Sequence, residues 1–250
     1  MKRALCRWTA ATTLAAAACL AHAQAYPTKP VRLVVPFSAG GTSDFIARSL
    51  AKKLSEAFGG QAFIVDNRAG AGGTLGTDIV AKAPGDGYTL LIYHIAIATG
   101  PWLYKQLPYD PRRDIAPVTQ IGSTPSIMAA TSAMSAVAAV KTGKVRAITS
   151  LGQKRVPVMP ELSTLGEQGF PNISITNTYN LWVPARTSPA IIAAINQVVS
   201  EGMNSPEIEQ QLLSRGSEAV DPMPPQTLKA EIARDYADLQ KSVKELGLTF

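Results

Sequence analysis

The chain has 250 residues, of which 46% are hydrophobic and 17% are charged, and its formal net charge is +6. This length suffices for one large domain or for two smaller domains with sizeable cores. The basic residues are spread among acidic ones and accompany no nucleic-acid-binding motif, so we expect no nucleic acid as a partner.

The first 23 residues have the pattern of a signal peptide. Residues 1–8 carry three basic side chains and no acidic one, residues 9–20 are almost entirely apolar, and Ala21-His22-Ala23 offers a cleavage site. The apolar run is shorter than the roughly 20 residues that cross a bilayer. We therefore predict cleavage after Ala23 and a periplasmic location. A lipoprotein anchored through Cys19 is the alternative, which Ala16 disfavours because such signals usually have leucine there.

Cleavage at this position restricts the chemistry of the exported chain. It removes Cys6, Cys19 and His22, and it lowers the net charge to +3 because 21 basic residues then face 18 acidic ones. Zinc sites and cysteine nucleophiles are excluded, and no Gly-x-Ser-x-Gly motif accompanies His94. We expect no catalytic residue, no metal and no cofactor. An exported enzyme that uses His94 is the weakest alternative.

The first half of the exported chain alternates strands and helices. Apolar runs and glycine stops predict, in order, a strand at 31–36, a helix at 44–58, a strand at 62–66, a helix at 74–83 and a strand at 88–93. This order predicts a parallel sheet.

The second half has more turn residues. After a short helix at 101–107 we expect strands at 116–122 and 126–130, separated by what resembles a crossover, and a further strand at 145–150. Turns and one short helix are predicted for residues 157–170. Three helices follow, beginning near Pro189, Pro206 and Pro225, because proline is favoured in the first helical turn.

Two glycine-rich loops each follow a predicted strand and open a predicted helix. The first comprises Phe37, Ser38, Ala39, Gly40, Gly41, Thr42, Ser43 and Asp44, and the second comprises Gly70, Ala71, Gly72, Gly73 and Thr74. Such loops expose backbone N–H groups at the positive end of a helix dipole, where a carboxylate or phosphate binds. The first loop is explained equally well as a tight turn capped by Thr42 or Ser43. The second has more small residues than a turn requires, and Leu75 breaks the spacing of a dinucleotide-binding motif.

Several motifs together closely resemble the Bug-type family, the periplasmic substrate-binding proteins of tripartite tricarboxylate transporters. They read YPTKPVRLVVPF at 26–37, GGTSDFIAR at 40–48, VDNRAGAGG at 65–73, PGDGYTLL at 84–91, LYKQLPYDP at 103–111, GKVRA at 143–147 and LSTLGEQG at 162–169. The resemblance covers nearly all of the exported chain.

The resemblance implies an α/β protein of the periplasmic-binding-protein, or Venus flytrap, type, whose two domains close over a small organic carboxylate. It implies that the two glycine-rich loops hold the ligand, that Thr99 in the loop after the third strand is a weaker contact, and that membrane transporter subunits are the partners of a monomeric receptor.

The sequence departs from the family near residue 132, where several dozen residues of the second domain are missing. We expect a parallel-rich domain 1 formed by residues 26–121 and 183–250, and a truncated domain 2 formed by residues 122–182. A flytrap that cannot close loses the coupling between ligand and closure. Two main alternatives follow: a carboxylate-binding receptor with a reduced second domain, or a nonfunctional remnant of one.

Overall fold

The computed structural model describes residues 26–94, 97, 99–104, 106–127, 131–132, 137, 139–142, 145–218, 220–221 and 223–245. Six strands form one sheet in the order β2-β1-β3-β6-β4-β5. Their bounds are β1 Val31–Val35, β2 Phe63–Asn67, β3 Thr89–His94, β4 Ile115–Ile127, β5 Thr131–Ser132 and β6 Thr176–Pro184. The predicted signal peptide and its cleavage site lie outside the described residues.

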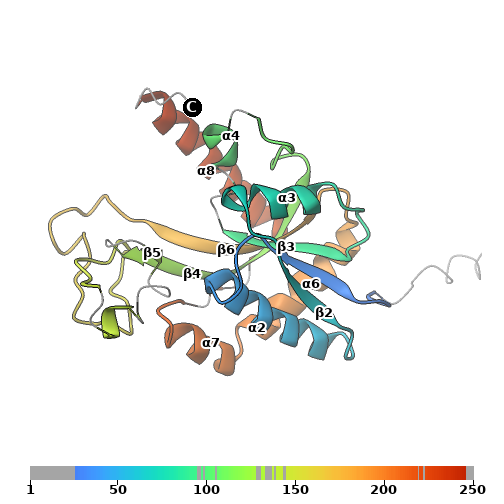
Figure 1. Cartoon of the computed structure of the whole chain (residues 1–250), viewed down its shortest axis with the longest axis horizontal. Coiled ribbons are helices and arrows are strands. Elements are labelled where there is room, and N and C mark those ends of the chain that lie inside the picture. The colour runs from blue at the N-terminus through green and yellow to red at the C-terminus, as the bar shows by residue number, and fades with distance from the viewer. Residues whose placement is uncertain are drawn as a thin grey trace, which may run out of the picture.

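Helices cover both faces of the sheet (Figure 1). Helices α2 (Thr42–Ala57), α6 (Pro189–Met203) and α7 (Pro206–Leu213) lie on one face. On the other face lie α3 (Thr74–Ala81) and α8 (Pro225–Glu245). The side chains of β1 alternate between the two faces of the sheet. Leu33 and Val35 belong to the core beneath α2, and Val34 belongs to the core beneath α3.

The predicted parallel arrangement is confirmed for the first three strands. Strand β1 pairs in parallel with β2 on one side and with β3 on the other. Helix α2 connects β1 to β2, and its apolar stripe of Ile46, Leu50 and Leu54 is fully buried. The carboxyl ends of β1, β2 and β3 therefore meet at one edge of the sheet.

The prediction was wrong about the centre of the sheet. Strand β6 was not predicted, yet it pairs antiparallel with both β3 and β4, so the sheet is mixed. The two strands expected at 116–122 and 126–130 are largely one strand, β4, with no crossover between them. Strand β4 continues past Pro117 because the register of its pairing with β6 shifts next to this residue. Pro125 lies opposite Thr176 of β6.

Three smaller expectations also differ from the structure. Helix α4 (Gly100–Leu103) stops short of the predicted end at residue 107. The strand expected at 145–150 is reduced to one isolated bridge between Ser150 and Thr164, and residues 157–170 contain turns but no helix. A small core of Val137, Val156, Met159 and Leu162 organises this region instead. Prolines at 157 and 160 interrupt the helical pattern there.

The division into two domains stays a prediction. Strands β4 and β6 run through the expected boundaries at 121/122 and 182/183. Residues 145–175, which precede β6, lie beyond the ends of β5 and β6, at the left of Figure 1, away from β1 and β2. Among the described helices, none combines the length and apolar character that crossing a membrane requires.

Candidate ligand-binding site

The structure brings the two predicted loops together at the carboxyl edge of the parallel strands. The first loop joins β1 to α2. The second loop follows β2, contains a short 3₁₀ helix, η1 (Ala71–Gly73), and leads into α3. The Asn67 side-chain amide donates a hydrogen bond to the Phe37 carbonyl (3.1 Å), and the Arg68 N–H donates to the Val35 carbonyl (2.7 Å). The end of β2 is thus fastened to the start of the first loop.

The first loop leaves the N-terminus of α2 without a side-chain cap. The N-cap residue is Gly41, in extended conformation. The alternative explanation of this loop, a tight turn capped by Thr42 or Ser43, is therefore wrong about the cap. Residues 38–41 are exposed, whereas Thr42, Ser43 and Asp44 are buried. N–H groups in the first turn of a helix lack intrahelical acceptors and lie at the positive end of its dipole. This arrangement suits an anion.

Asp44 places a carboxylate beside this anion-binding geometry, and its charge is already partnered. Its Oδ2 accepts hydrogen bonds from the Gly40 N–H (2.9 Å) and from Arg48 Nε (3.0 Å). Burial alone raises the pKa of Asp44, but the hydrogen bonds from Arg48 and Gly40 outweigh it and hold the pKa below its usual value. The ionised Asp44 therefore holds the backbone of the first loop at Gly40 and is itself paired with Arg48.

Two tyrosines hold the second loop. The Tyr93 hydroxyl donates to the Gly72 carbonyl (2.5 Å), and the Tyr104 hydroxyl donates to the Ala71 carbonyl (3.1 Å). A Cβ at Gly72 would overlap the Tyr104 hydroxyl, and one at Gly73 would lie 2.7 Å from the Tyr93 ring. Both glycines therefore have a packing reason to be small. This weakens the argument that the small residues of the loop themselves indicate a ligand.

Backbone strain at the second loop gives separate support for a functional role. Ala71 has a φ of 47°, a conformation that side chains other than glycine seldom adopt, and within the described ranges no other non-glycine residue has a positive φ. Strained backbone of this kind is concentrated at binding and active sites. Gly70 and Thr74 flank the strained turn, and α3 begins at Thr74 without a side-chain cap.

An aromatic cluster lies behind the first loop. The His94 ring stacks on Phe37 at 5.1 Å between centroids, Tyr93 packs against both rings, and Tyr179 meets His94 edge-on at 6.2 Å. Burial lowers the pKa of His94 to about 4, so this imidazole is neutral near pH 7. Its position is that of a packed ring supporting Phe37.

The third predicted contact, Thr99, lies at the start of α4 and does not cap that helix with its side chain. The segment that it begins reaches the second loop through Tyr104, which follows α4. Sequence reasoning missed Tyr93, Tyr104 and Asn67 as supports of the site. Asn67 was discoverable, because it follows β2 directly inside a motif that resembles the family.

Asp44 and Asp66 do not form an acid–base pair. Asp66 accepts hydrogen bonds from Arg32 and from Arg68 Nε (3.0 Å), while Asp44 is bound to Arg48. Burial raises the pKa of Asp66, but the hydrogen bonds from Arg68 and Arg32 outweigh it and lower the pKa overall. Each carboxylate is thus held ionised by its own arginine partners.

The fold defines the class of the protein. It matches the structure of the periplasmic binding protein BugD with a TM-score of 0.81 at 23% identity, over 90% of this chain and 99% of that one. Two Rhodopseudomonas palustris structures match similarly: Rpa4515 with adipate (TM-score 0.81, 24% identity, 90% of this chain and 99% of that one) and MatC with bound malate (0.79, 22%, 87% and 100%). The fold is that of a periplasmic binding protein.

The chain belongs to the tripartite tricarboxylate transporter family of receptors, whose model matches residues 46–135 and 126–248. Protein BugT of Bordetella pertussis is 26% identical over 300 aligned positions, which cover 90% of this chain and 91% of that protein. A UPF0065 protein of Pseudomonas sp. strain P51 is 45% identical over 104 residues, covering 42% of this chain and 31% of the relative.

These matches also locate the departure from the family. The alignment with BugT is longer than this chain itself, so BugT has residues without a counterpart here. The two family matches meet at residues 126–135, where the sequence predicts the missing segment. The chain is therefore shorter than its relatives within the region after β4.

Proposed function

We propose that this chain is a periplasmic solute-binding protein that captures a small organic carboxylate for a transporter of the tripartite tricarboxylate type. The observation that carries the proposal is the meeting of the two glycine-rich loops at one sheet edge, with uncapped helix N-termini behind them. Membership of the receptor family supports it, as do the adipate and malate found with two proteins of the same fold. In this role the chain binds its ligand and catalyses no reaction.

In the proposed site, backbone N–H groups of the first loop bind one carboxylate of the ligand. The exposed stretch from Ser38 to Gly41 gives access, and the buried Thr42, Ser43 and Asp44 fix the start of α2. Gly70 to Thr74 forms the opposite wall, held by tyrosines, and Phe37 with the ring of His94 behind it provides an apolar wall. Thr99 is the outermost contact. The ligand requires neither a metal nor a cofactor.

Gly41→Ala tests this site without disturbing the fold. Gly41 has a φ of −83°, which alanine adopts freely, and an added Cβ would meet only the Ser38 carbonyl oxygen at 3.7 Å. The methyl group would instead occupy the space through which a carboxylate approaches the N–H groups. We expect an unchanged melting temperature without ligand and at least tenfold weaker binding, a loss of about 1.4 kcal/mol or more.

The measurement is thermal unfolding with adipate, malate, citrate, succinate, glutamate, nicotinate and benzoate. One of these acids should raise the melting temperature saturably, because a ligand present at about 100 times its Kd stabilises the native state by roughly 2.7 kcal/mol. Lys82→Ala is a matched control, since among the described residues this exposed side chain pairs only with Asp78 on α3. An equal shift in wild type and Gly41→Ala would contradict the proposed site.

Export is part of the proposal. We expect the N-terminus of the protein recovered from the periplasm to be Gln24, because the signal peptide is cut after Ala23. Intact-mass measurement of the periplasmic fraction checks this, and Ala23→Phe, which removes the small residue before the cut, should leave the precursor uncleaved. Recovery of a lipid-modified Cys19 would instead establish a membrane-anchored receptor.

The remnant hypothesis remains a second candidate, because the region around the missing segment exposes large apolar side chains. Ile148 is 60% exposed, Phe170 54% and Ile175 51%, all within residues 145–175. A cooperative unfolding transition that no acid shifts, or the absence of a cooperative transition, would favour a nonfunctional remnant. An exported enzyme using His94 ranks last, since burial lowers the pKa of this ring to about 4, which makes it a weak base, and the ring is stacked on Phe37.

A further inference from the structure

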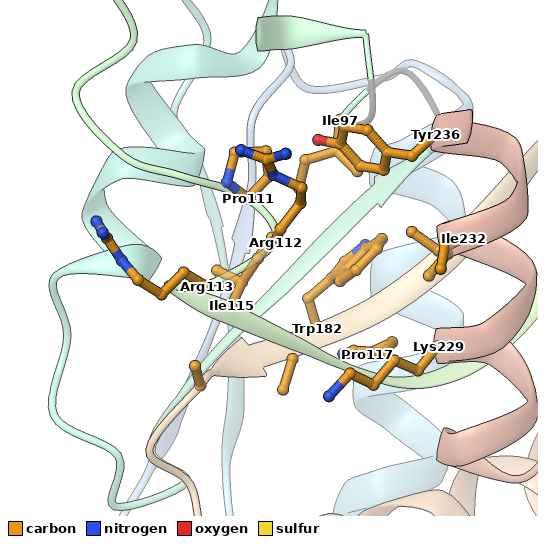
Figure 2. Close-up of a pocket in the computed structure, with 13 residues that line it drawn as sticks. Ile97, Pro111, Arg112, Arg113, Ile115, Pro117, Trp182, Lys229, Ile232 and Tyr236 are labelled. Atoms are coloured by element: carbon orange, nitrogen blue, oxygen red, sulfur yellow. The ribbon is translucent and has the colours of Figure 1, made fainter. Parts of the chain in front are cut away.

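A cavity of about 360 Å³ lies between α8 and the strands β4 and β6, on the face of the sheet opposite α2 (Figure 2). None of the residues of the proposed carboxylate site lines it. Its volume falls within the roughly 300–1,000 Å³ typical of small-molecule pockets. The cavity is therefore a candidate for a second, separate ligand.

The floor of this cavity is apolar. Trp182 and Ile115 are almost completely buried, and Ile232 closes the side formed by α8. The Trp182 Nε1 group already donates a hydrogen bond to the Tyr93 carbonyl (3.4 Å), so its indole has no free donor for a ligand. An aliphatic or aromatic body would bury its surface against this floor.

The rim is positively charged. Arg112 and Lys229 lie at opposite ends of the pocket in Figure 2, and Arg113 lines it as well but directs its guanidinium group away from the other lining side chains. Arg112 is paired with Asp110 (3.1 Å) and Arg113 with Asp114 (3.0 Å). Lys229 has no ion pair with any carboxylate in the part of the chain that the structure describes. It therefore presents an uncompensated positive charge over an apolar floor.

A buried donor lies at the other end of the same cavity. The Tyr236 hydroxyl is shielded from solvent and makes no hydrogen bond within the described residues. Tyr236 lies at the opposite end of the pocket from Lys229, so a carboxylate bound at Lys229 does not use this hydroxyl. The apolar floor and the free cation at Lys229 together match an amphipathic anion.

We propose that this cavity binds a medium-chain carboxylate, with its chain on Trp182 and Ile232 and its carboxylate at Lys229. The site is independent of the glycine-rich loops, from which none of its lining residues comes. Octanoate is the probe, and 1-octanol, which has the same chain without the charge, is the comparison. Calorimetric titration of the purified protein should give saturable octanoate binding that is at least about tenfold tighter than octanol binding.

Three variants test the assignment. Ala233→Phe, at an exposed lining position of α8, should fill the pocket and abolish octanoate binding, whereas Ala230→Phe, exposed on the same helix but not lining the pocket, should leave it unchanged. Lys229→Glu should weaken octanoate binding about tenfold with little effect on octanol. The melting temperatures of all three variants establish that they are folded.

Several results would overturn the proposal. Unsaturable binding, equal affinity for octanoate and octanol, or octanoate binding that survives Ala233→Phe would each show that the cavity does not select a carboxylate. Gly41→Ala separates the two sites, because it should impair the proposed receptor site and leave octanoate binding intact. If Gly41→Ala abolished octanoate binding, the octanoate would be bound at the glycine-rich loops and this second site would not exist.

Discussion

We expect replacement of Gly73 with alanine to lower the free energy of unfolding by about 2–4 kcal/mol, because backbone strain and overpacking act together at this position. Gly73 has a φ of 97°, where a Cβ is unfavourable, and the new methyl group would lie 2.7 Å from the ring of Tyr93. The Tyr93 ring is nearly fully buried and its hydroxyl is bonded to Gly72, so it has little room to move. Urea denaturation measures the effect.

Gly40→Ala is the matched control for this substitution. Gly40 also has a positive φ, 86°, but a Cβ there would meet no atom within 4 Å. It should therefore cost only the backbone contribution, about 1–2 kcal/mol. If the two variants lost equal stability, contact with Tyr93 would not be what requires glycine at position 73.

We expect acidification from pH 6.5 to pH 4 to remove up to about 3 kcal/mol of stability through His94 alone. The pKa of His94 is about 4 in the folded protein because burial disfavours its charged form, and about 6.5 in the unfolded chain. Between these values the unfolded state binds the proton more readily. The contribution of His94 is thus complete above about pH 6.5 and is lost as the pH falls towards 4.

His94→Phe provides the comparison, because a phenyl ring can keep the stacking on Phe37 without titrating. The difference in unfolding free energy between wild type and this variant should shift by about 3 kcal/mol against the wild type between pH 7 and pH 4. Asp44 and Asp66, whose pKa values are lowered, lose their contributions only below about pH 4. Asp235, whose pKa is raised by burial, acts in the opposite direction. A pH-independent difference between wild type and variant would contradict a buried, neutral His94.

The sequence predicts the first half of the fold well because its signals are local. The apolar run of β1, the stripe of α2 and the glycines that end it are each recognisable in a short stretch of sequence, and they suffice to define parallel strands joined by helices. The same local signals locate both glycine-rich loops. They do not identify Tyr93 and Tyr104 as the groups that hold the second loop, since those contacts cross 21 and 33 positions of sequence.

The central strand β6 escaped prediction for a related reason. Its sequence, TNTYNLWVP, mixes threonine and asparagine with aromatic residues and has no clear alternation. It is buried because it lies between β3 and β4, two strands that precede it by many residues. The prolines of β4 similarly suggest a break, whereas the register shift beside Pro117 accommodates one of them without ending the strand.

The position of β6 also governs when the chain can fold. Strands β3 and β4 are not paired with each other, and the strand between them is among the last to be synthesised, with Trp182 donating a hydrogen bond to Tyr93 across 89 positions. Contacts of such long range slow folding, because a large loop must close before they form. A nascent chain that ends before residue 176 therefore lacks the strand that unites its sheet. In the export proposed above, this delay would favour translocation, since an exported polypeptide is threaded across the membrane before its tertiary structure is complete.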